Sequence, residues 1–491
     1  MPINSFLYPA PSTPTFAYNV ANSLRFNDGS SDNLVRTNAS ATNNTKYTLS
    51  AWVKRSTLGT NQSLLYNWYD GSSHAYIFFA TDDKLAIYDQ LSGTDNINMK
   101  TSAVFRDVSA WYHIVVAVDT TESTQADRVK VYINGVEDPI GTRSAQPGSS
   151  ASLGMKTNSL SNYMAISSFV NNSSTYLDGY ICEYVYIDGQ ALAHTDLGEF
   201  DSDSPTIWKP KDVSGLTFGN NGFYLDFEDS SSLGNDAAGS NNFSVNNLTA
   251  IDQSTDTCTN NFATFNGALG YNSTIVLAEG NLKGTTGSTH EALTQSIFSS
   301  IGVTQGKWYA EFKVTTNSNH SLVGISADME SDADGSSGSA YSFIYLGQGL
   351  GYYGSNGKIF HTNSDTQMTY GSAVSNNDIV GVALDVDNQE VYFSINGTFQ
   401  NSGNPASGSS KTGGVVNEGA RNIFSTGTGT LFFVVADHDR DSTCAIEANF
   451  GGGSVSAISS GNSDANGYGN FEYSVPSGYY SLCTKNLAEF G

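Results

Sequence analysis

Two stretches of the chain repeat one pattern: an apolar run, a polar turn, an alternating run and then Ile-Asn-Gly. They occupy residues 111–136 and 378–400. The closing dipeptides are Asn134-Gly135 and Asn396-Gly397. An Asn-Gly pair favours a type I′ β-turn, because both central residues of that turn need positive φ. Alternation with period two before each turn predicts strands with one buried face. The repeat therefore predicts two β domains of similar construction, each with this hairpin near its centre.

The rest of the chain is also rich in short strand-like runs and almost free of helical periodicity. Only 14% of the residues are charged and 12% are aromatic, which is typical of a turn-rich antiparallel β protein. Turn signals roughly every 8–12 residues favour sandwiches or jelly rolls. We expect an extended proline-containing arm over 1–15, a first domain over 16–200, a connector with one strand over 201–260, a second domain over 261–450 and a folded C-terminal tail over 451–491.

The charge balance excludes some partners. The net charge is −25, so the surface repels phosphate backbones and anionic lipids, and we expect neither nucleic-acid binding nor membrane insertion. The N-terminus shows neither the basic nor the apolar region of a secretory signal. The four cysteines are widely spaced, which predicts free thiols of a protein made in a reducing cytoplasm.

Particular motifs carry resemblances to two domain families. The segments SLRFNDGSSDNLVR, TLSAWVKR, WYHIVVAVD, VKVYINGV and LDGYICEYVYIDGQAL resemble the laminin-G-like, concanavalin-A-like jelly roll over most of 16–200. The segments GKWYAE at 306–311, Val-Gly-Ile at 323–325, the stretch 352–360 and the stretch 378–399 resemble a SPRY (B30.2-like) domain. The resemblances imply an all-β fold of two concanavalin-A-like sandwiches in series. For the second domain they imply protein recognition through loops at one rim.

The order of these domains implies a setting. Together with MPINSFLYP…VANSLRF and the ending CTKNL, it resembles structural proteins of marine and cyanobacterial tailed phages. The resemblance implies a non-enzymatic virion protein, a fibre, appendage or capsid decoration, that contacts other virion proteins and attaches to host surfaces. A homotrimer and a virion location, after synthesis in the host bacterial cytoplasm, are the corresponding expectations.

Two carboxylates suggest an enzymatic alternative. Asp226 and Glu228 are two residues apart on an expected strand and would share a face, as a glycosidase acid/base pair does. Jelly-roll glucanases carry a third acid two positions earlier, where this chain has Tyr224. Solvated strand carboxylates are the favoured interpretation, and a host polysaccharide-degrading enzyme remains the alternative. For His113, beside Trp111 and Tyr112, a structural role at a strand edge is favoured.

Calcium is the one candidate cofactor. Asn462, Asp464 and Asn466 alternate before Gly467, as in the first half of a calcium loop. A second acidic cluster consists of Asp437, Asp439 and Asp441. The alternative is that Asp, Asn and Gly simply form turns in both places.

A glycan-binding lectin is the remaining alternative function. Trp68 and Tyr69 stand beside Asp70 at an expected strand end. An aromatic ring can stack on the apolar face of a sugar while carboxylates bind its hydroxyls. The competing interpretation is that one ring lies in the core and the other is an ordinary surface residue.

Overall fold

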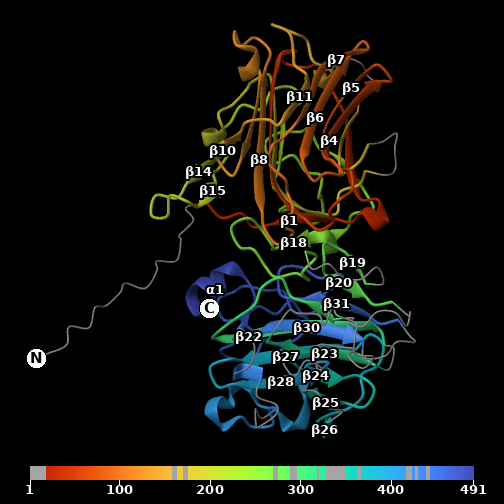
Figure 1. The fold of residues 1–491 in the computed structure, drawn as a ribbon, viewed down its shortest axis with the longest axis vertical. Coiled ribbons are helices and arrows are strands. Elements are labelled where there is room, and N and C mark those ends of the chain that lie inside the picture. The colour runs from red at the N-terminus through yellow and green to blue at the C-terminus, as the bar shows by residue number, and fades with distance from the viewer. Residues whose placement is uncertain are drawn as a thin grey trace, which may run out of the picture.

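The computed structural model describes residues 18–156, 163–169, 175–268, 275–287, 296–317, 320–327, 349–361, 367–415, 423–425, 429–437 and 443–491. Two β-sandwich domains follow one another along the long axis of the molecule, the first in red to yellow and the second in green to blue (Figure 1). The described residues contain one α-helix, α1 (Thr484–Phe490). The predicted all-β fold of two sandwiches is confirmed. Among the described residues, no helix has the length and apolar character needed to cross a membrane.

The first domain consists of two eight-stranded sheets. The hairpin sheet runs β10-β9-β8-β3-β13-β1-β18, with β16 paired to β13. Its strands are β1 (Ser23–Phe26), β3 (Lys46–Arg55), β8 (Tyr112–Asp119), β9 (Val129–Ile133), β10 (Val136–Asp138), β13 (Gly179–Asp188), β16 (Phe223–Leu225) and β18 (Gln253–Ser254). The opposite sheet runs β11-β7-β6-β5-β4-β12-β2-β17. Its strands are β2 (Asn33–Thr37), β4 (Gln62–Asp70), β5 (Ser73–Phe79), β6 (Leu85–Leu91), β7 (Thr94–Lys100), β11 (Thr142–Ala145), β12 (Tyr163–Ile166) and β17 (Ser244–Asn246).

The second domain is built in the same way. Its hairpin sheet runs β19-β20-β31-β22-β27-β28-β29, with β32 parallel to β22. These strands are β19 (Val276–Ala278), β20 (Lys283–Thr285), β22 (Lys307–Thr316), β27 (Ile379–Asp385), β28 (Glu390–Ile395), β29 (Thr398–Phe399), β31 (Ala445–Asn449) and β32 (Tyr480–Ser481). Its opposite sheet runs β21-β30-β23-β24-β25-β26. These strands are β21 (Ser296–Phe298), β23 (Ser321–Ser326), β24 (Gly349–Tyr353), β25 (Lys358–His361), β26 (Gln367–Thr369) and β30 (Phe432–Asp437).

Short 3-10 turns lie in the connections. They are η1 (Asp28–Ser30), η2 (Gln125–Asp127), η3 (Gly154–Lys156), η4 (His194–Asp196), η5 (Ala250–Asp252), η6 (Gln400–Ser402), η7 (Pro405–Ser410) and η9 (Ile423–Ser425).

Each hairpin sheet is buried on both faces. In β3, Leu49, Ala51 and Val53 lie in the core between the sheets, as their alternation predicts. Trp52 on the opposite face packs with Trp111 and Trp208 instead of facing water. In the second domain, Tyr309 on the outer face of β22 is covered by side chains of the C-terminal segment 451–491, which folds back on the sheet as predicted.

The segment 201–260 belongs to the first domain. The sequence predicts one strand there within a connector, but three strands of this segment, β16, β17 and β18, pair with strands of both first-domain sheets. A further strand, β15 (Trp208–Pro210), pairs with β14 (Gly198–Phe200). The segment 201–260 is rich in Asp, Ser and Gly, as linkers are. Its strands are only two or three residues long, so they are hard to predict from the sequence.

A bulge in β13 changes which side chains face the core. The register with β3 shifts between Cys182 and Val185, and Glu183 has a φ of 50°. Tyr184 and Tyr186 consequently lie in the core, whereas Cys182 packs on the outer face. Simple period-two alternation would put Tyr180, Cys182, Tyr184 and Tyr186 on one face, and the inserted residue of the bulge divides them between the two faces.

The two Asn-Gly hairpins are held in the same way. Asn134 and Asn396 have φ of 47° and 48°, and the glycines that follow have 79° and 77°, as type I′ turns require. Asn134 Oδ1 accepts the backbone N–H of His113 at 2.7 Å, and Asn396 Oδ1 accepts that of Ile379 at 2.9 Å. An aromatic ring covers each of these two glycines. A Cβ on Gly135 would lie 2.2 Å from the Trp208 ring, and one on Gly397 would lie 2.5 Å from the Tyr473 ring.

Buried polar contacts join the two domains. The Lys54 ammonium, 1% exposed, pairs with Asp256 of the first domain at 2.8 Å. It also donates to Asn261 Oδ1 at 2.8 Å and to the carbonyl oxygen of Phe262 at 3.0 Å, at the start of the second domain. The hydroxyl of Tyr180 donates to the carbonyl oxygen of Gly280 at 2.9 Å. The strands β1 and β18 approach the second domain at this junction in Figure 1.

Candidate functional site

A row of aromatic side chains crosses the solvent face of the opposite sheet in the first domain. We call the side chains of Tyr66, Trp68, His74, Tyr76 and Tyr88 the aromatic ladder. They come from β4, β5 and β6, where the register pairs Trp68 with His74, Tyr66 with Tyr76, and Tyr76 with Tyr88. The residues between them, such as Ala75 and Ile77, point into the core. Strand pairing therefore places rings on adjacent strands directly beside one another.

Four of the ladder rings stack, whereas Tyr66 is tilted by 35° to Tyr76. Tyr76 and Tyr88 have centroids 4.6 Å apart at an interplanar angle of 13°. His74 lies 5.8 Å from Tyr76 and 5.6 Å from Tyr88, with angles of 15° and 25°. Trp68 continues the row 5.7 Å from His74 at 27°. Rings that stack in this way are held rigidly, because each restricts the rotamers of the next.

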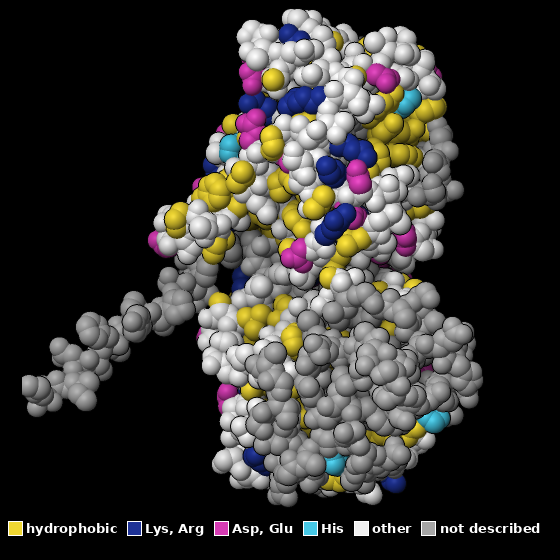
Figure 2. All heavy atoms as spheres, viewed as in Figure 1, with side chains coloured by type: hydrophobic (Ala, Val, Ile, Leu, Met, Phe, Trp, Pro, Cys, Tyr) yellow, Lys and Arg dark blue, Asp and Glu magenta, His cyan; other side chains and the backbone are white. Residues whose placement is uncertain are grey.

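Two further aromatic side chains flank the ladder. Phe169 packs against Tyr66 at 4.8 Å and against Tyr76 at 5.0 Å. Tyr163 of β12 lies 6.4 Å from Tyr66. Figure 2 shows hydrophobic side chains gathered at the upper right, over the region where Figure 1 labels β4 and β5. Tyr66 is buried against these rings at 4% exposed, and the other ladder rings leave a partly exposed aromatic surface on this side of the sheet.

Polar groups border the ladder on the side of β7. Asp95 accepts hydrogen bonds from the hydroxyl of Tyr88 and from Gln90 Nε2. Burial, together with this bond, raises the pKa of Tyr88, so the hydroxyl stays protonated at neutral pH. Nδ1 of His74 is buried and has no hydrogen-bond partner among the described residues. The surface combines apolar rings with hydrogen-bonding groups at one edge.

The structure separates the three predicted glycan-binding residues. Trp68, half-buried, belongs to the ladder. A bulge between Trp68 and Asp70 leaves Tyr69 outside it, 37% exposed. Asp70 Oδ1 accepts the backbone N–H and the hydroxyl of Ser72, and these hydrogen bonds lower the pKa of Asp70. Asp70 therefore shapes the β4–β5 turn.

Most ladder residues were not predicted from the sequence, although the alternation in β5 indicates an aromatic face. In the stretch SHAYIFF, one alternating set is His74, Tyr76 and Phe78. The other set includes Ala75 and Ile77, which fill the core. When one face of a strand is in the core and the other is aromatic instead of polar, the solvent face is a candidate binding surface.

The predicted calcium loop has its oxygens engaged by protein donors. Asp464 Oδ1 accepts the N–H groups of Asn466 and Tyr468 at 2.9 and 3.0 Å. Asp464 Oδ2 accepts the N–H and hydroxyl of Ser481 and the amide of Asn486 at 2.7–2.9 Å. These donors point hydrogen atoms at the carboxylate where a cation would sit. The residues therefore do not fit a calcium site.

The other predicted calcium ligands form no site in the described structure. The side-chain amide of Asn462 donates to the carbonyl of Glu472 at 3.0 Å, and that of Asn466 donates to Asn486 Oδ1 at 3.0 Å. Asp437 is buried in β30 and accepts from the hydroxyl of Thr286 at 3.3 Å. Asp439 and Asp441 lie outside the described residues. No group of three or more His, Cys, Asp or Glu side chains is arranged for a metal in the described ranges.

The paired carboxylates are also not arranged as predicted. β16 ends at Leu225, and Phe227 has a φ of 59°, so Asp226 and Glu228 do not continue one strand. The backbone N–H of Glu228 donates to Asp226 Oδ1 at 3.2 Å, which is a local turn contact. The predicted common face of an acid/base pair is therefore missing.

His113 is buried on the outer face of a central strand and does not lie at a strand edge. It is 1% exposed on β8, between β3 and β9, and burial lowers its pKa to about 3. The imidazole stacks on Trp52 with centroids 4.6 Å apart. The structural role expected for His113 agrees with these contacts.

Comparison with protein families assigns both sandwiches. Residues 28–197 match the concanavalin A-like lectin/glucanases superfamily, in its laminin-G group. Residues 307–415 match the SPRY domain. The chain carries a concanavalin A-like domain and a SPRY domain. The aromatic ladder lies in the concanavalin A-like domain.

Solved structures resemble parts of the chain at low identity. The SPRY domain of human HERC1 is 17% identical, and the match covers 35% of this chain and 91% of that one, with a TM-score of 0.25. A native heptameric SAP-like pentraxin from Limulus polyphemus is 12% identical, covering 36% and 82%, with a TM-score of 0.27. A putative carbohydrate binding protein from Bacteroides ovatus is 14% identical, covering 47% and 59%, with a TM-score of 0.32. No curated protein matches the chain.

Proposed function

We propose that the concanavalin A-like domain binds glycans through the aromatic ladder. The observation that carries the proposal is the row of parallel rings on the solvent face, bordered by Gln90 and Asp95. Rings supply apolar contact for the C–H faces of sugars, and amides and carboxylates bind hydroxyls. The match to a lectin-type superfamily supports this function.

The shape of the ladder favours an extended glycan. The ring centroids of Tyr76 and Tyr88 are 4.6 Å apart, so each ring covers one face of the other. A sugar therefore meets ring edges along the row and a free face only at its ends. Several sugar units lying across the sheet would use the row better than one unit would, because each contact adds a small increment.

A glycan array of bacterial surface polysaccharides tests the proposal. We expect Trp68→Ala and Tyr88→Ala each to weaken binding about tenfold, since one aromatic contact is worth on the order of 1 kcal/mol. Phe200→Ala is the matched control, because Phe200 is an aromatic residue 43% exposed outside the ladder. Silence across the array, or equal loss with the control, would contradict the proposal.

The proposal is one of binding without catalysis. Asp226 and Glu228 lie in a turn and do not face each other across a cleft, which favours a non-enzymatic role. An assay for reducing sugar released from the bound polysaccharide checks this. We expect no release, and release abolished by Glu228→Gln would overturn the expectation.

A virion protein is the second candidate, carried by the sequence resemblance to tailed-phage structural proteins. A host-attaching fibre or decoration protein, trimeric and in contact with other virion proteins, would use a glycan-binding face directly. Mass spectrometry of purified particles tests the location, and light scattering of the purified protein tests the trimer. A polypeptide missing from the particles would remove this candidate and leave glycan binding untouched.

A further inference from the structure

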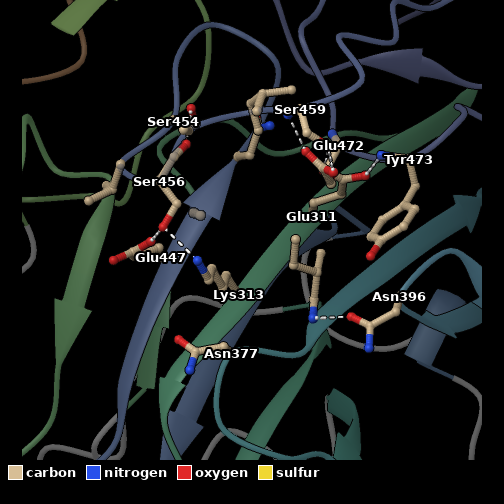
Figure 3. A pocket seen from close by; sticks show the side chains of 16 residues that line it. Glu311, Lys313, Asn377, Asn396, Glu447, Ser454, Ser456, Ser459, Glu472 and Tyr473 are labelled. Atoms are coloured by element: carbon tan, nitrogen blue, oxygen red, sulfur yellow. Dashed lines mark hydrogen bonds between the residues drawn. The ribbon is translucent and has the colours of Figure 1, made fainter. Parts of the chain in front are cut away.

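The SPRY domain contains a cavity of about 240 Å³ between the outer face of its hairpin sheet and the C-terminal segment (Figure 3). Its floor includes Lys313 of β22, paired with Glu447 of β31 on one side and with Ile379 of β27 on the other. Residues 454–459, together with Glu472 and Tyr473, form the remaining wall. No residue of the aromatic ladder lines this cavity, so it is a separate site.

The floor holds an ammonium and a carboxylate that share one hydroxyl. Ser456 Oγ accepts from Lys313 Nζ at 2.8 Å and donates to Glu447 Oε2 at 2.6 Å (Figure 3). A hydroxyl can accept from one group and donate to another at the same time. Glu447 is only 9% exposed, so its position is fixed by the surrounding structure. The pair is therefore arranged to recognise hydroxyl groups.

The other carboxylates of the cavity are used by the protein. Glu311 accepts the N–H groups of Glu472 and Tyr473 at 2.9 Å each, which attaches the C-terminal segment to β22. Burial is the largest cause that raises the pKa of Glu311, to about 7. Glu472 accepts the N–H and hydroxyl of Ser459. The oxygens of Glu311 and Glu472 therefore face protein donors, and at the floor Lys313 and Glu447 offset each other's charge on either side of Ser456.

Apolar groups complete the wall. Ile379 and Ile458 line the cavity, and so does the ring of Tyr473, which is held against Gly397. Rings and aliphatic groups next to hydroxyl-binding groups suit a sugar, whose ring has apolar C–H faces and a polar rim. A volume of about 240 Å³ lies just below the roughly 300–1,000 Å³ of pockets for drug-sized ligands, which suits a ligand of one sugar ring.

We propose that this cavity binds one neutral hydroxylated ring, a monosaccharide or the terminal unit of a glycan. The SPRY domain then carries a second recognition site, independent of the ladder. Two sites on one chain can engage the same polysaccharide, which raises avidity without new contacts at either site.

Ligand-observed NMR on the full chain tests the site with named probes. These are the methyl glycosides of glucose, galactose, mannose and N-acetylglucosamine, with cadaverine and succinate as charged probes of similar size. We expect a sugar to bind and both charged probes to fail. Lys313→Met and Glu447→Gln should each weaken binding about tenfold or more, because each removes a charged hydrogen-bonding partner.

Variants at both sites distinguish binding in the cavity from binding at the ladder and from a loss of folding. Trp68→Ala should keep the cavity signal, and Glu447→Gln should keep the ladder's signal on the glycan array. Glu447→Gln preserves size, so it tests the site even where Lys313→Met lowers the melting temperature. Binding of cadaverine or succinate alone, or of no probe, overturns the proposal. A silent array with cavity binding intact would instead overturn only the function proposed for the ladder.

Discussion

The indole Nε1 of Trp208 donates to Nδ1 of His113 at 2.7 Å. A tryptophan N–H can only donate, so Nδ1 is an acceptor and the proton of the neutral imidazole is on Nε2. That nitrogen lies 2.8 Å from the hydroxyl of Ser50, which it meets as a donor. The tautomer of a buried histidine is thus fixed by a residue from the segment that closes over the Asn134 hairpin.

Acid should weaken the first domain through His113. Burial and the nearby His194 lower the pKa of His113 from 6.5 to about 3. Between these values the unfolded chain binds a proton that the folded chain excludes, so the stabilisation is complete above pH 6.5 and is lost as the pH falls toward 3. The loss is on the order of 5 kcal/mol over the whole window.

A comparison of the wild type with a variant at His113 separates the effect of His113 from that of titrating carboxyl groups. One such group is Glu183, whose pKa is raised by burial to about 7. Urea unfolding of the wild type and of His113→Gln should give a gap in the free energy of unfolding that favours the wild type at neutral pH. The gap should narrow by about 3 kcal/mol toward pH 4, because glutamine does not titrate. A gap that stays constant with pH would contradict the prediction.

The rings over the hairpin glycines should make those glycines hard to replace. In Gly135→Ala, the new Cβ would be 2.2 Å from the Trp208 ring and φ is 79°. We expect a loss of about 3 kcal/mol in the free energy of unfolding, from backbone strain and displacement of Trp208. Gly93→Ala is the control, because Gly93 has a φ of 78° and nothing within 4 Å of its Cβ position. It should cost about 1 kcal/mol, and equal costs would refute a role for the ring.

Lys54 should couple the two domains. Lys54→Met leaves the buried Asp256 without its ammonium partner and removes the bonds to Asn261 and Phe262 of the second domain, which should cost about 3–5 kcal/mol. Calorimetry of Lys54→Met should also show a separate unfolding transition for each domain, because the contacts that couple the unfolding of the two domains are weakened. Lys130→Met removes an exposed ion pair to Glu137 and should cost less than about 1 kcal/mol. Identical melting curves for the two variants would disprove the coupling.

Asp464 should stabilise the C-terminal segment without calcium. Asp464→Ala removes the acceptor of five hydrogen bonds, which should cost about 3 kcal/mol. The melting temperature of the wild type should be unchanged by a chelator or by added calcium, because a ligand of the native state must stabilise it. Asp229→Ala, at an exposed turn, is the control and should have a small effect. A melting temperature that falls with chelator would reinstate the calcium site.

The hairpins and core strands could be predicted from sequence because the signal is local. Asn134-Gly135 and the alternation of Trp308, Ala310 and Phe312 determine a turn and a face without reference to the rest of the chain. The β13 bulge at Glu183 could not be predicted in the same way, since nothing nearby in the sequence requires it. The same holds for the segments over the hairpin sheets, whose composition indicates loops.

The sites were predicted less well than the fold because they combine distant residues. Trp68 was predicted from its neighbours, but its ladder partners Tyr76 and Tyr88 come from other strands. The cavity joins Lys313 to Ser456, 143 residues later, which lies in the segment predicted as a folded tail without a site of its own. Asp464, predicted as a cation ligand, shows the converse error. A turn residue and a metal ligand have the same local sequence, and only the donors around the carboxylate distinguish them.

The ring of Trp208 over Gly135 determines where the first domain can be cut. A fragment with the bounds of the family match, 28–197, would lack Trp208, the strand β16 that pairs with β13 and the strand β17 that pairs with β2. It would expose the imidazole of His113 and an unpaired sheet edge, and we expect it to aggregate. A fragment that keeps every described strand of the sandwich must extend through β18, which ends at Ser254. The unit that folds is therefore longer than the unit that its sequence family defines.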